Sequence, residues 1–301
     1  METITKKYVK YLLKRRDRRS SKGDFGRLLI VAGSPGMVGA AALCATGALR
    51  GGAGLVSVSV DESLFSIVQT CVPCAVCVKR SEAAKLLTFR EEDASVRSGK
   101  GDAMSHAAPL YEAAVIGPGI GMSSDARETT EAILGAYTGI LVIDADALNL
   151  VAASGLNVRD SRASAILTPH EGEAARLLGT ERDRVRSDRE GAARALAERF
   201  GATTILKGSD TLVASPGGDI YVNPTGNPGM ATGGSGDVLS GVVAAFAGQG
   251  LSAQDAARAG AYVHGLAGDM RAREIGEYGL IASDIADALP RAILSVQQSR
   301  R

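Results

Sequence analysis

Short apolar runs recur along this chain, and each is followed by a cluster of glycine or polar residues. The first run, from Arg27 to Ala32, is apolar at nearly every position, which is typical of a strand buried on both faces of a sheet. It leads into a glycine loop at 33–41 and then into a helical stretch that ends near Arg50. Further apolar runs predict strands at 54–60, 113–116, 140–143, 165–168 and 203–206. Because strands and helices alternate without a convincing linker, we expect one three-layer α/β domain spanning 1–301.

The pattern changes after the strand at 203–206. Residues 211–214 and 220–222 are short apolar runs separated by a Pro-Gly-Gly turn, which predicts an antiparallel edge on a mostly parallel sheet. The helix predicted after 237 has one apolar face, formed by Leu239, Val242, Val243 and Phe246. A second helix should begin near Ser252, which can cap it, and Gly260 would let it pack closely. His264 lies beside the apolar face of that helix, and we interpret it as structural.

The glycine-rich segment 227–237 ends where the first of these two helices begins. Glycine amides and the positive end of a helix dipole together form a plausible cradle for a phosphate group. Asp237 is unexpected there because a carboxylate repels phosphate, but it is well placed to take a proton from a second substrate. The alternative is a simple glycine turn whose acidic residue stabilises the helix dipole.

Glycine and polar clusters also follow four successive predicted strands, at 117–121, 144–149, 169–173 and 207–210. Ligands of open parallel sheets bind outside the carboxyl ends of the strands, so these clusters are candidates for one site. The glycine loop at 33–41 has the spacing G-x-x-G-x-x-G, which is not the dinucleotide-binding fingerprint. No G-x-x-x-x-G-K-[ST] phosphate loop occurs anywhere in the chain.

Composition and charge describe an ordinary soluble protein, with 45% apolar and 22% charged residues and a formal charge of +1. These values give no case for nucleic acid or a membrane as a partner. Residues 1–22 nevertheless carry nine Lys and Arg against Glu2 and Asp17, a net of +7. We expect a short helical arm with a solvated basic face there. No signal peptide or membrane span is apparent, so we expect a cytoplasmic protein.

Three cysteines, Cys71, Cys74 and Cys77, have the spacing C-x2-C-x2-C, which can hold zinc or an iron–sulfur cluster. The fourth, Cys44, falls in a predicted helix, and in an extended segment Cys74 and Cys77 would face opposite sides. We therefore interpret the cysteines as small apolar residues in a reducing compartment and expect no metal ligands among them.

Taken together in their order, these segments resemble the ADP/ATP-dependent NAD(P)H-hydrate dehydratases of the ribokinase-like superfamily. The resemblance covers nearly the whole chain after residue 20, and it rests on segments 22–26, 33–41, 51–56, 117–119, 144–149, 168–170, 207–208 and 227–241. It implies a three-layer α/β/α ribokinase-like fold and an enzyme that restores hydrated NADH or NADPH. In the stand-alone bacterial type, ADP phosphorylates the added hydroxyl, and elimination of phosphate leaves NAD(P)H and AMP. No counterpart of the epimerase domain of some relatives is expected.

The resemblance also implies roles for individual residues. The catalytic base is Asp237, and the contacts to the hydrated nicotinamide nucleotide are Ala40, Gly119, His170 and Asp237. The nucleotide-binding residues are Lys207, Gly208, Ser209, Asp210, Thr211 and Gly236, and the amides of Gly233, Gly234 and Gly236 form an anion hole. Further candidates for shaping the substrate or metal site are Asp144, Asn149 and Glu173. Each has a plainer interpretation: Ala40 as mere clearance, His170 as a capping or core residue, Lys207 as a solvated strand-end lysine, and Asp144 and Asn149 as turn formers.

The implied cofactor is Mg2+, bridging nucleotide oxygens with few protein ligands, and the implied assembly is a homo-oligomer, a tetramer. Two other functions compete with this interpretation. One is a conventional small-molecule kinase of the same fold, such as a vitamin-precursor kinase, for which the phosphoester is the final product. The other is a non-catalytic nucleotide sensor, although a sensor would not need Asp237.

Overall fold

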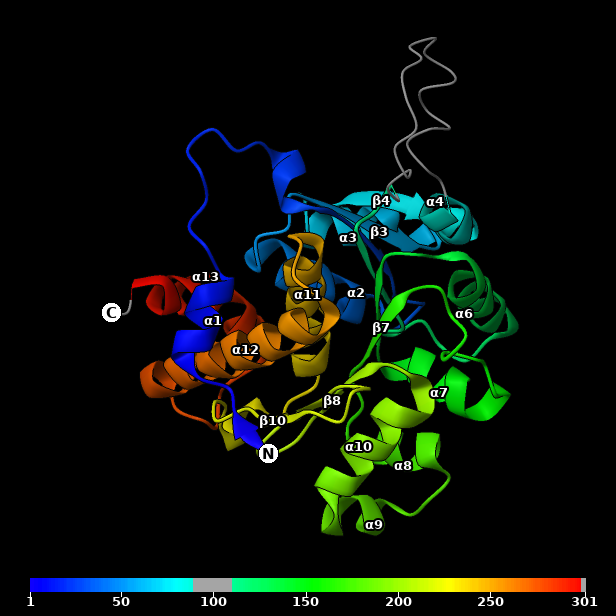
Figure 1. Ribbon diagram of the computed structural model, residues 1–301. Helices are drawn as coiled ribbons and strands as arrows, with labels where there is room; N and C mark the ends of the chain where they lie inside the picture. The colour runs from blue at the N-terminus through cyan, green and yellow to red at the C-terminus, as the bar shows by residue number, and fades with distance from the viewer. Residues whose placement is uncertain (89–109, 299–301) are drawn as a thin grey trace, which may run out of the picture.

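The computed structural model describes residues 1–88 and 110–298, and its centre is a ten-stranded sheet (Figure 1). From edge to edge the strand order is β1-β10-β9-β8-β7-β6-β5-β2-β3-β4. All neighbours from β8 to β4 are parallel, whereas β9 is antiparallel to both β8 and β10. The strands are β1 (Glu2–Thr3), β2 (Arg27–Val31), β3 (Leu55–Val60), β4 (Val76–Lys79), β5 (Ala113–Ile116), β6 (Ile140–Ile143), β7 (Ser164–Leu167), β8 (Thr203–Leu206), β9 (Leu212–Ala214) and β10 (Ile220–Val222).

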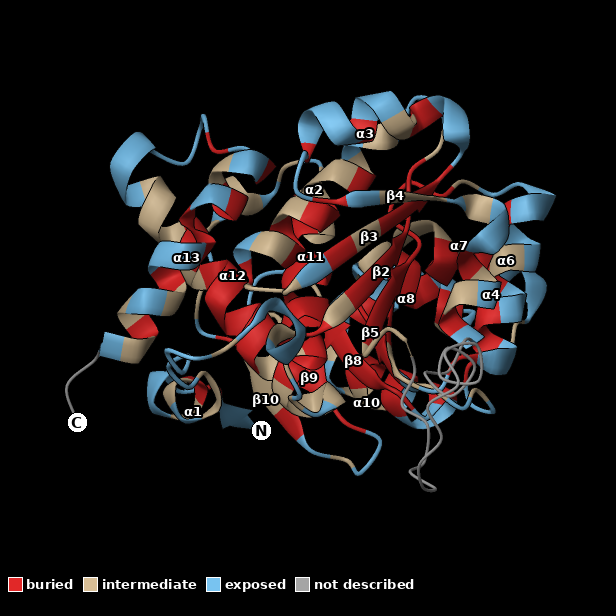
Figure 2. Ribbon diagram, turned by 90° about the horizontal axis from the view of Figure 1, so that it is seen from above, coloured by how far each residue is buried: buried red, intermediate tan, exposed pale blue. Residues whose placement is uncertain are grey.

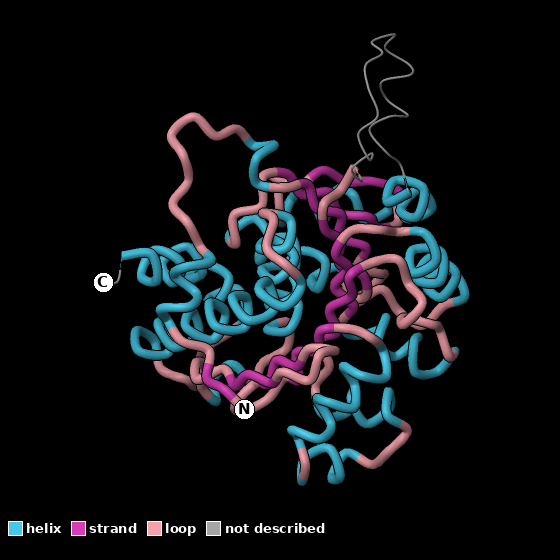
Figure 3. Tube along the Cα trace, viewed as in Figure 1, coloured by secondary structure: helices cyan, strands magenta, loops and turns pink. Residues whose placement is uncertain are grey.

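Helices cover both faces of this sheet, as the layers in Figure 1 and Figure 3 show. One face carries α1 (Lys6–Leu12), α2 (Val38–Arg50), α3 (Phe65–Cys71), α11 (Ser235–Gly248), α12 (Ala253–Ile275) and α13 (Ala282–Gln298). The other carries α4 (Ala83–Thr88), α6 (Ser124–Ala136), α7 (Ala145–Ser154), α8 (Glu171–Leu178), α9 (Arg182–Ser187) and α10 (Arg189–Phe200). Single 3-10 turns are η1 (Lys22–Phe25), η2 (Glu62–Leu64), η3 (Arg80–Glu82) and η4 (Pro228–Met230).

Strand β2 shows why its sequence is apolar at successive positions. Leu28 and Ile30 belong to the core on the α2 and α11 side, while Leu29 and Val31 belong to the core on the opposite side. Side chains of a strand alternate between faces, so a strand between two helical layers has no solvated face to fill with polar residues. Figure 2 shows these central strands buried along their length.

Helix α11 is more deeply buried than its sequence pattern predicts. The predicted apolar face is present, but every residue from Val238 to Gly248 is buried, not one face alone. The helix is enclosed by α2, α12 and the sheet, and small residues make this possible. A Cβ at Gly241 would lie 2.0 Å from the carbonyl oxygen of Cys44 on α2, so the two backbones touch there. This packing fixes the position of the N-terminus of α11.

The remaining segments agree with the predictions in part. The basic arm contains the expected helix α1, which contacts α12 and α13, but the pairing of β1 with β10 was not predicted. The polar residues 80–110 predict an irregular, exposed connection, but residues 80–88 form η3 and α4. The rest of the polar connection predicted at 80–110 falls largely at 89–109, outside the described residues. No helix within the described ranges is long and apolar enough to cross a membrane.

The cysteines divide into one buried and three peripheral thiols. Cys44 lies in the core on α2, where burial and then the charges of Asp237 and Asp144 hold its thiol pKa well above the usual value. Cys71 and Cys74 are exposed, so these two do not pack as small apolar residues in the core. Within residues 1–88 and 110–298, no group of three or more His, Cys, Asp or Glu side chains is arranged to hold a metal ion.

Candidate active site

The glycine-rich segment 227–237 forms the start of α11, at the carboxyl-end side of the sheet. Asn227 begins it by capping η4, its side-chain oxygen accepting a hydrogen bond from the Gly229 amide at 3.1 Å. Gly234 is the residue before the helix and has φ of +89°, a left-handed conformation that favours glycine. No side chain caps α11. The first amides of a helix lack intrahelical acceptors, so this end of α11 offers donors and positive potential to an anion.

Asp237, in the first turn of α11, has an environment suited to a general base. Its pKa is raised to about 7, mainly because burial penalises the carboxylate and secondly because Asp144 lies nearby. The charge of Lys207 opposes this rise. A base with a pKa near the working pH combines adequate proton affinity with a large deprotonated fraction. The predicted base therefore has the electrostatics that proton removal from a hydroxyl requires.

Lys207 and two carboxylates form a buried charged cluster beside Asp237. The Lys207 Nζ lies 2.9 Å from Asp144 Oδ1 and 3.7 Å from Glu173 Oε2. Burial acts to lower the pKa of Lys207, but the two carboxylates outweigh it and raise that pKa, so the ammonium stays charged. Asp144 is 1% exposed, and its second oxygen accepts a hydrogen bond of 2.7 Å from the Ser240 hydroxyl. A Cβ at Gly236 would lie 3.2 Å from Lys207 Nζ, so this cluster adjoins the amides of the cradle.

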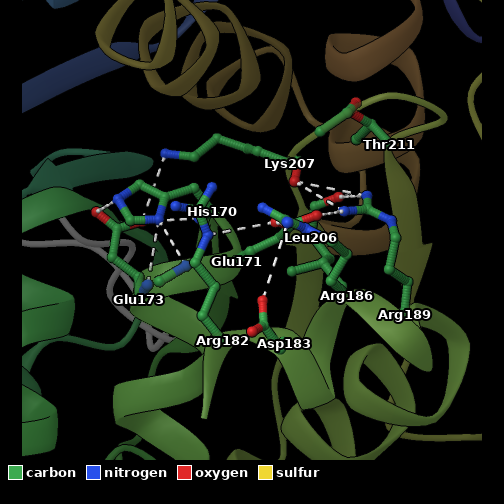
Figure 4. A network of polar contacts seen from close by, with 12 residues as sticks. His170, Glu171, Glu173, Arg182, Asp183, Arg186, Arg189, Leu206, Lys207 and Thr211 are labelled. Carbon is green, nitrogen blue, oxygen red and sulfur yellow. Dashed lines mark hydrogen bonds and ion pairs between the residues drawn. The ribbon is translucent and has the colours of Figure 1, made fainter.

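The turn from Lys207 to Thr211 joins β8 to β9 and has an unusual backbone. Gly208 has φ of +146° and Asp210 has φ of +54°. Arg189 holds the start of this turn, donating to the carbonyl oxygens of Leu206 at 3.3 Å and Lys207 at 3.5 Å while it pairs with Glu171 at 2.9 Å (Figure 4). The Thr211 hydroxyl donates to the Gly208 carbonyl oxygen. Five of the six predicted nucleotide-binding residues, 207–211, thus lie in one constrained turn, and the sixth, Gly236, lies in the first turn of α11.

His170 caps helix α8. Its Nδ1 accepts hydrogen bonds from the amides of Gly172 and Glu173 at 2.9 and 3.2 Å, and the Glu173 carboxylate accepts from the His170 amide at 2.8 Å. Because Nδ1 is an acceptor, the neutral ring carries its proton on Nε2, which lies 3.4 Å from Glu173 Oε1. Burial is the main cause that lowers the ring's pKa. The sequence did not decide between capping and ligand contact for His170. The structure shows that it caps α8, and its side chain nevertheless remains 54% exposed.

Ala40, in the first turn of α2, meets Gly119, in the loop after β5. A Cβ at Gly119 would lie 3.0 Å from that of Ala40, and Gly119 has φ of +59°. The Ser34 hydroxyl donates to the Gly119 carbonyl oxygen at 2.9 Å, and Asp146 accepts from the Gly121 amide at 2.9 Å. Gly119 is buried and Ala40 is half-buried, so small residues at these positions allow this close packing.

The structure brings together most of the predicted site residues, with one exception. Asn149 does not join the charged cluster, because its side-chain oxygen accepts from Arg176 on α8 at 2.9 Å. A Cβ at Gly233 would have no neighbour within 4 Å, so the space beside this residue is open. Ser240 and Arg189 also belong to the site, although the sequence did not predict them as site residues. Ser240 was recognisable, since it follows Asp237 by three positions and so shares its helix face, whereas nothing local marks Arg189.

A mostly parallel mixed sheet, flanked by helices and carrying an acidic residue at the glycine-rich start of a buried helix, defines a protein of ribokinase-like fold. A crystal structure of the ADP/ATP-dependent NAD(P)H-hydrate dehydratase of Bacillus subtilis, co-crystallised with ATP and Mg2+, superposes with a TM-score of 0.81 at 28% identity, covering 98% of both chains. A ribokinase-like superfamily protein of Enterococcus faecalis superposes with a TM-score of 0.82 at 25% identity, covering 99% of this chain and 97% of that one.

Sequence relatives narrow the class to a family. A family model described as NAD(P)H-hydrate dehydratase matches residues 28–291. An ADP-dependent (S)-NAD(P)H-hydrate dehydratase of Neisseria meningitidis is 39% identical, over 92% of this chain and 88% of its own. A bifunctional NAD(P)H-hydrate repair enzyme of Moorella thermoacetica is 38% identical over 98% of this chain, which spans 54% of that relative's length. The chain belongs to the NAD(P)H-hydrate dehydratase family, which confirms the resemblance and the ribokinase-like fold inferred from its motifs.

Proposed function

We propose that this protein is an ADP-dependent (S)-NAD(P)H-hydrate dehydratase. The observation that carries the proposal is the position of Asp237, a half-buried carboxylate with a pKa of about 7 at the uncapped start of α11. A purely nucleotide-binding protein has no use for a poised base beside a phosphate cradle. The name of the N. meningitidis relative supports ADP as the nucleotide, and that relative is matched over most of its length.

The proposed reaction begins with phosphoryl transfer to the ring hydroxyl of hydrated NADH or NADPH. As the hydroxyl oxygen attacks the terminal phosphorus of ADP, Asp237 accepts its proton, and the bond from that phosphorus to the bridging oxygen breaks to release AMP. The ring nitrogen's electron pair then expels inorganic phosphate, and loss of a proton from the adjacent ring carbon restores the double bond of NAD(P)H. The sum consumes one hydrate and one ADP and gives NAD(P)H, AMP, phosphate and a proton.

Electrostatic stabilisation of the transferring phosphoryl group is assigned to the backbone. The amides of Gly233, Gly234 and Gly236 would face its oxygens, and the dipole of α11 would favour its charge. Lys207 reaches the edge of the same cradle from β8, where Asp144 and Glu173 hold it in place. Its turn, from Gly208 to Thr211, would contact the rest of the nucleotide, while His170, Ala40 and Gly119 would contact the hydrate.

Magnesium fits this site as an ion held mainly by the nucleotide. Asp144 and Glu173 already pair with Lys207, and Asp146 accepts from the Gly121 amide, so few carboxylate oxygens are left to bind a metal. Mg2+ usually keeps several waters and binds through phosphates with one or two carboxylates. When bound with ADP, it would neutralise charge on the phosphates and keep water molecules at most of its other coordination positions.

A spectroscopic assay tests the proposed function against its rivals. Hydrated NADH, ADP and Mg2+ are mixed with the protein, and recovery of the NADH absorption band is followed together with the nucleotide products. The proposal expects NADH and AMP to appear in equal amounts. A stable phosphoester without NADH would favour a small-molecule kinase, and nucleotide binding without turnover would favour a sensor.

The pH dependence of turnover should follow the ionisation of Asp237. The base acts only when deprotonated, so kcat/KM for the hydrate should rise with pH and level off with a midpoint near pH 7, the value to which the pKa of Asp237 is raised in the unliganded protein. Initial rates at hydrate concentrations well below KM, measured between about pH 5.5 and pH 8.5, check this. A rate that stays constant across this window, or that falls as pH rises, would contradict the assigned base.

A further inference from the structure

The segment that leads into the phosphate cradle, residues 223–230, is fastened to one face of helix α12. Asn223 Nδ2 donates to the Ala261 carbonyl oxygen at 3.1 Å, and the Thr225 hydroxyl donates to that of Tyr262 at 2.9 Å. Two glycines of α12 let the segment come this close. A Cβ at Gly265 would lie 2.3 Å from Thr225 Oγ1, and one at Gly268 would lie 2.3 Å from the sulfur of Met230. Helix α12 therefore serves as the template for this segment.

Asp269, also on α12, binds the segment at two successive residues. One carboxylate oxygen accepts from the Gly226 amide at 3.1 Å, and the other accepts from Asn227 Nδ2 at 3.0 Å. Asn227 in turn accepts from the Gly229 amide through its side-chain oxygen at 3.1 Å. Two of these hydrogen bonds link α12 to η4 through the side chain of Asn227, and the third holds Gly226 beside them. The glycines of the cradle, Gly233, Gly234 and Gly236, follow η4 in the chain.

The polarity of this relay is fixed at both ends. The Gly229 amide can only donate, so the Asn227 oxygen must face it, and the Asn227 amide group must face Asp269. The Gly226 amide also donates to position 269. Position 269 therefore needs a group that accepts twice, which a carboxylate does and an asparagine of the same shape does not. An asparagine there would turn its own NH2 group towards either the NH2 group of Asn227 or the Gly226 amide, or would make Asn227 turn and release Gly229.

The segment is held from its opposite side as well. A Cβ at Gly229 would lie 2.7 Å from the carbonyl oxygen of Glu277, in the connection between α12 and α13, and one at Gly234 would lie 3.1 Å from Cβ of Ala282. Residues 226–234 thus lie between α12, the connection that follows it, and α2. Packing encloses the segment, and the Asp269 relay sets its hydrogen-bonding register within that enclosure.

We propose that Asp269 is a positioning residue for the phosphoryl cradle, acting through Asn227 to hold the glycine amides in their productive arrangement. The inference deepens the proposed phosphoryl transfer and rests on it for its effect on rate. Asp269 contacts no reacting atom in this account. Preorganised donors act only if their geometry is held, and a displacement of about 1 Å can reduce a rate by about 10²-fold.

The test exploits the polarity of the relay. We expect Asp269→Asn and Asn227→Asp each to reduce kcat by about 10- to 100-fold, with a much smaller change in the KM for ADP. In the first variant two donors face each other, and in the second two carboxylates do.

The double variant Asn227→Asp with Asp269→Asn restores the pattern of donors and acceptors. The new carboxylate at position 227 then accepts from Gly229 and from the new amide group, while the new amide oxygen at position 269 accepts from Gly226. Its kcat should return to within about threefold of wild type if the two sites are coupled as a pair.

Glu274→Gln is the matched control. Glu274 also lies on α12 and loses its charge, but its partners are Arg271 and Arg291 and not the cradle segment. Its kcat should stay at the wild-type value. A merely structural role for Asp269 would make the double variant at least as impaired as the worse single variant, and that result would overturn the proposal, as would an unimpaired Asp269→Asn.

Hydrogen exchange gives a readout that does not depend on the reaction. By mass spectrometry on the unliganded protein, peptides covering 226–237 should exchange faster in Asp269→Asn, by about tenfold or more, and return towards wild type in the double variant. Exchange that is unchanged in the single variant would overturn the inference. If the wild-type protein fails to restore NADH while exchange follows this pattern, the proposed function fails and the assigned role of Asp269 in holding the segment stands.

Discussion

Replacing Asp237 with asparagine should reduce kcat by about 10²- to 10⁴-fold while leaving the affinity for ADP nearly unchanged. The substitution keeps the shape of the side chain and removes the group that accepts the hydroxyl proton. In the proposed complex the nucleotide contacts are made by the turn at 207–211 and by backbone amides, which the substitution leaves in place. Steady-state turnover and calorimetric titration with ADP measure the two quantities separately.

The same variant should be more stable than wild type at alkaline pH. Because the folded-state pKa of Asp237 is raised to about 7, the folded protein binds this proton more tightly than the unfolded chain does. Folding stability therefore falls as pH rises from about 4 to about 7, and asparagine removes that loss. Asp287→Asn, at an exposed ion pair with Arg50, is the control and should change neither property. Unchanged turnover in Asp237→Asn would remove this residue from the role of base.

Replacing Lys207 with methionine should have the largest effect on stability. Lys207 is 19% exposed and its main partner, Asp144, is 1% exposed, so the substitution leaves a buried carboxylate without its cation. Removing one partner of a buried ion pair typically costs about 3–5 kcal/mol of unfolding free energy. The raised pKa of Lys207 means that the intact pair stabilises the fold throughout the neutral range, and that this contribution is lost only as pH rises through that raised value.

A double variant separates the cost of the bare carboxylate from the loss of the lysine itself. Asp144→Asn with Lys207→Met should recover about 1–3 kcal/mol relative to the single lysine variant, because the unpaired charge is gone. Denaturant unfolding at neutral pH measures both values. Activity should stay low in both variants, since each lacks the cation at the edge of the cradle. Additive destabilisation by the two substitutions would show that Lys207 and Asp144 are not energetically coupled.

The parts of the fold that could be predicted are those with strong local signals. Strand β2 was predictable because it is buried on both faces and its residues are apolar at successive positions. Helix α11 was predictable in its start, since a glycine turn precedes it, but not in its burial on all sides, which depends on the close approach of α2 at Gly241. The pairing of β1 with β10 joins the two-residue strand 2–3 to residues far away in sequence, and no local pattern encodes it.

The candidate site shows the same division. Asp237 stands out because it ends a glycine-rich segment. Lys207 stands out because it directly follows a predicted strand and precedes Gly208. The sequence alone did not decide whether His170 caps a helix or contacts a ligand, because a histidine followed three positions later by a glutamate is compatible with both roles. Ser240, Arg189 and Asp269 act through contacts between elements. Their partners are 96, 17 or 18, and 42 or 43 residues away, so spacing along the chain does not reveal these contacts, although it does place Ser240 on the same helix face as Asp237.

The most direct test of the account follows the oxygen atom of the ring hydroxyl. Hydrated NADH carrying oxygen-18 at that position is converted with ADP and Mg2+, and the label is located by mass spectrometry. Phosphorylation followed by elimination places the label in inorganic phosphate, one atom for each NADH formed, with AMP as the other product. Label released into water, or held in a phosphoester that never yields NADH, would contradict phosphorylation of the ring hydroxyl followed by elimination of phosphate.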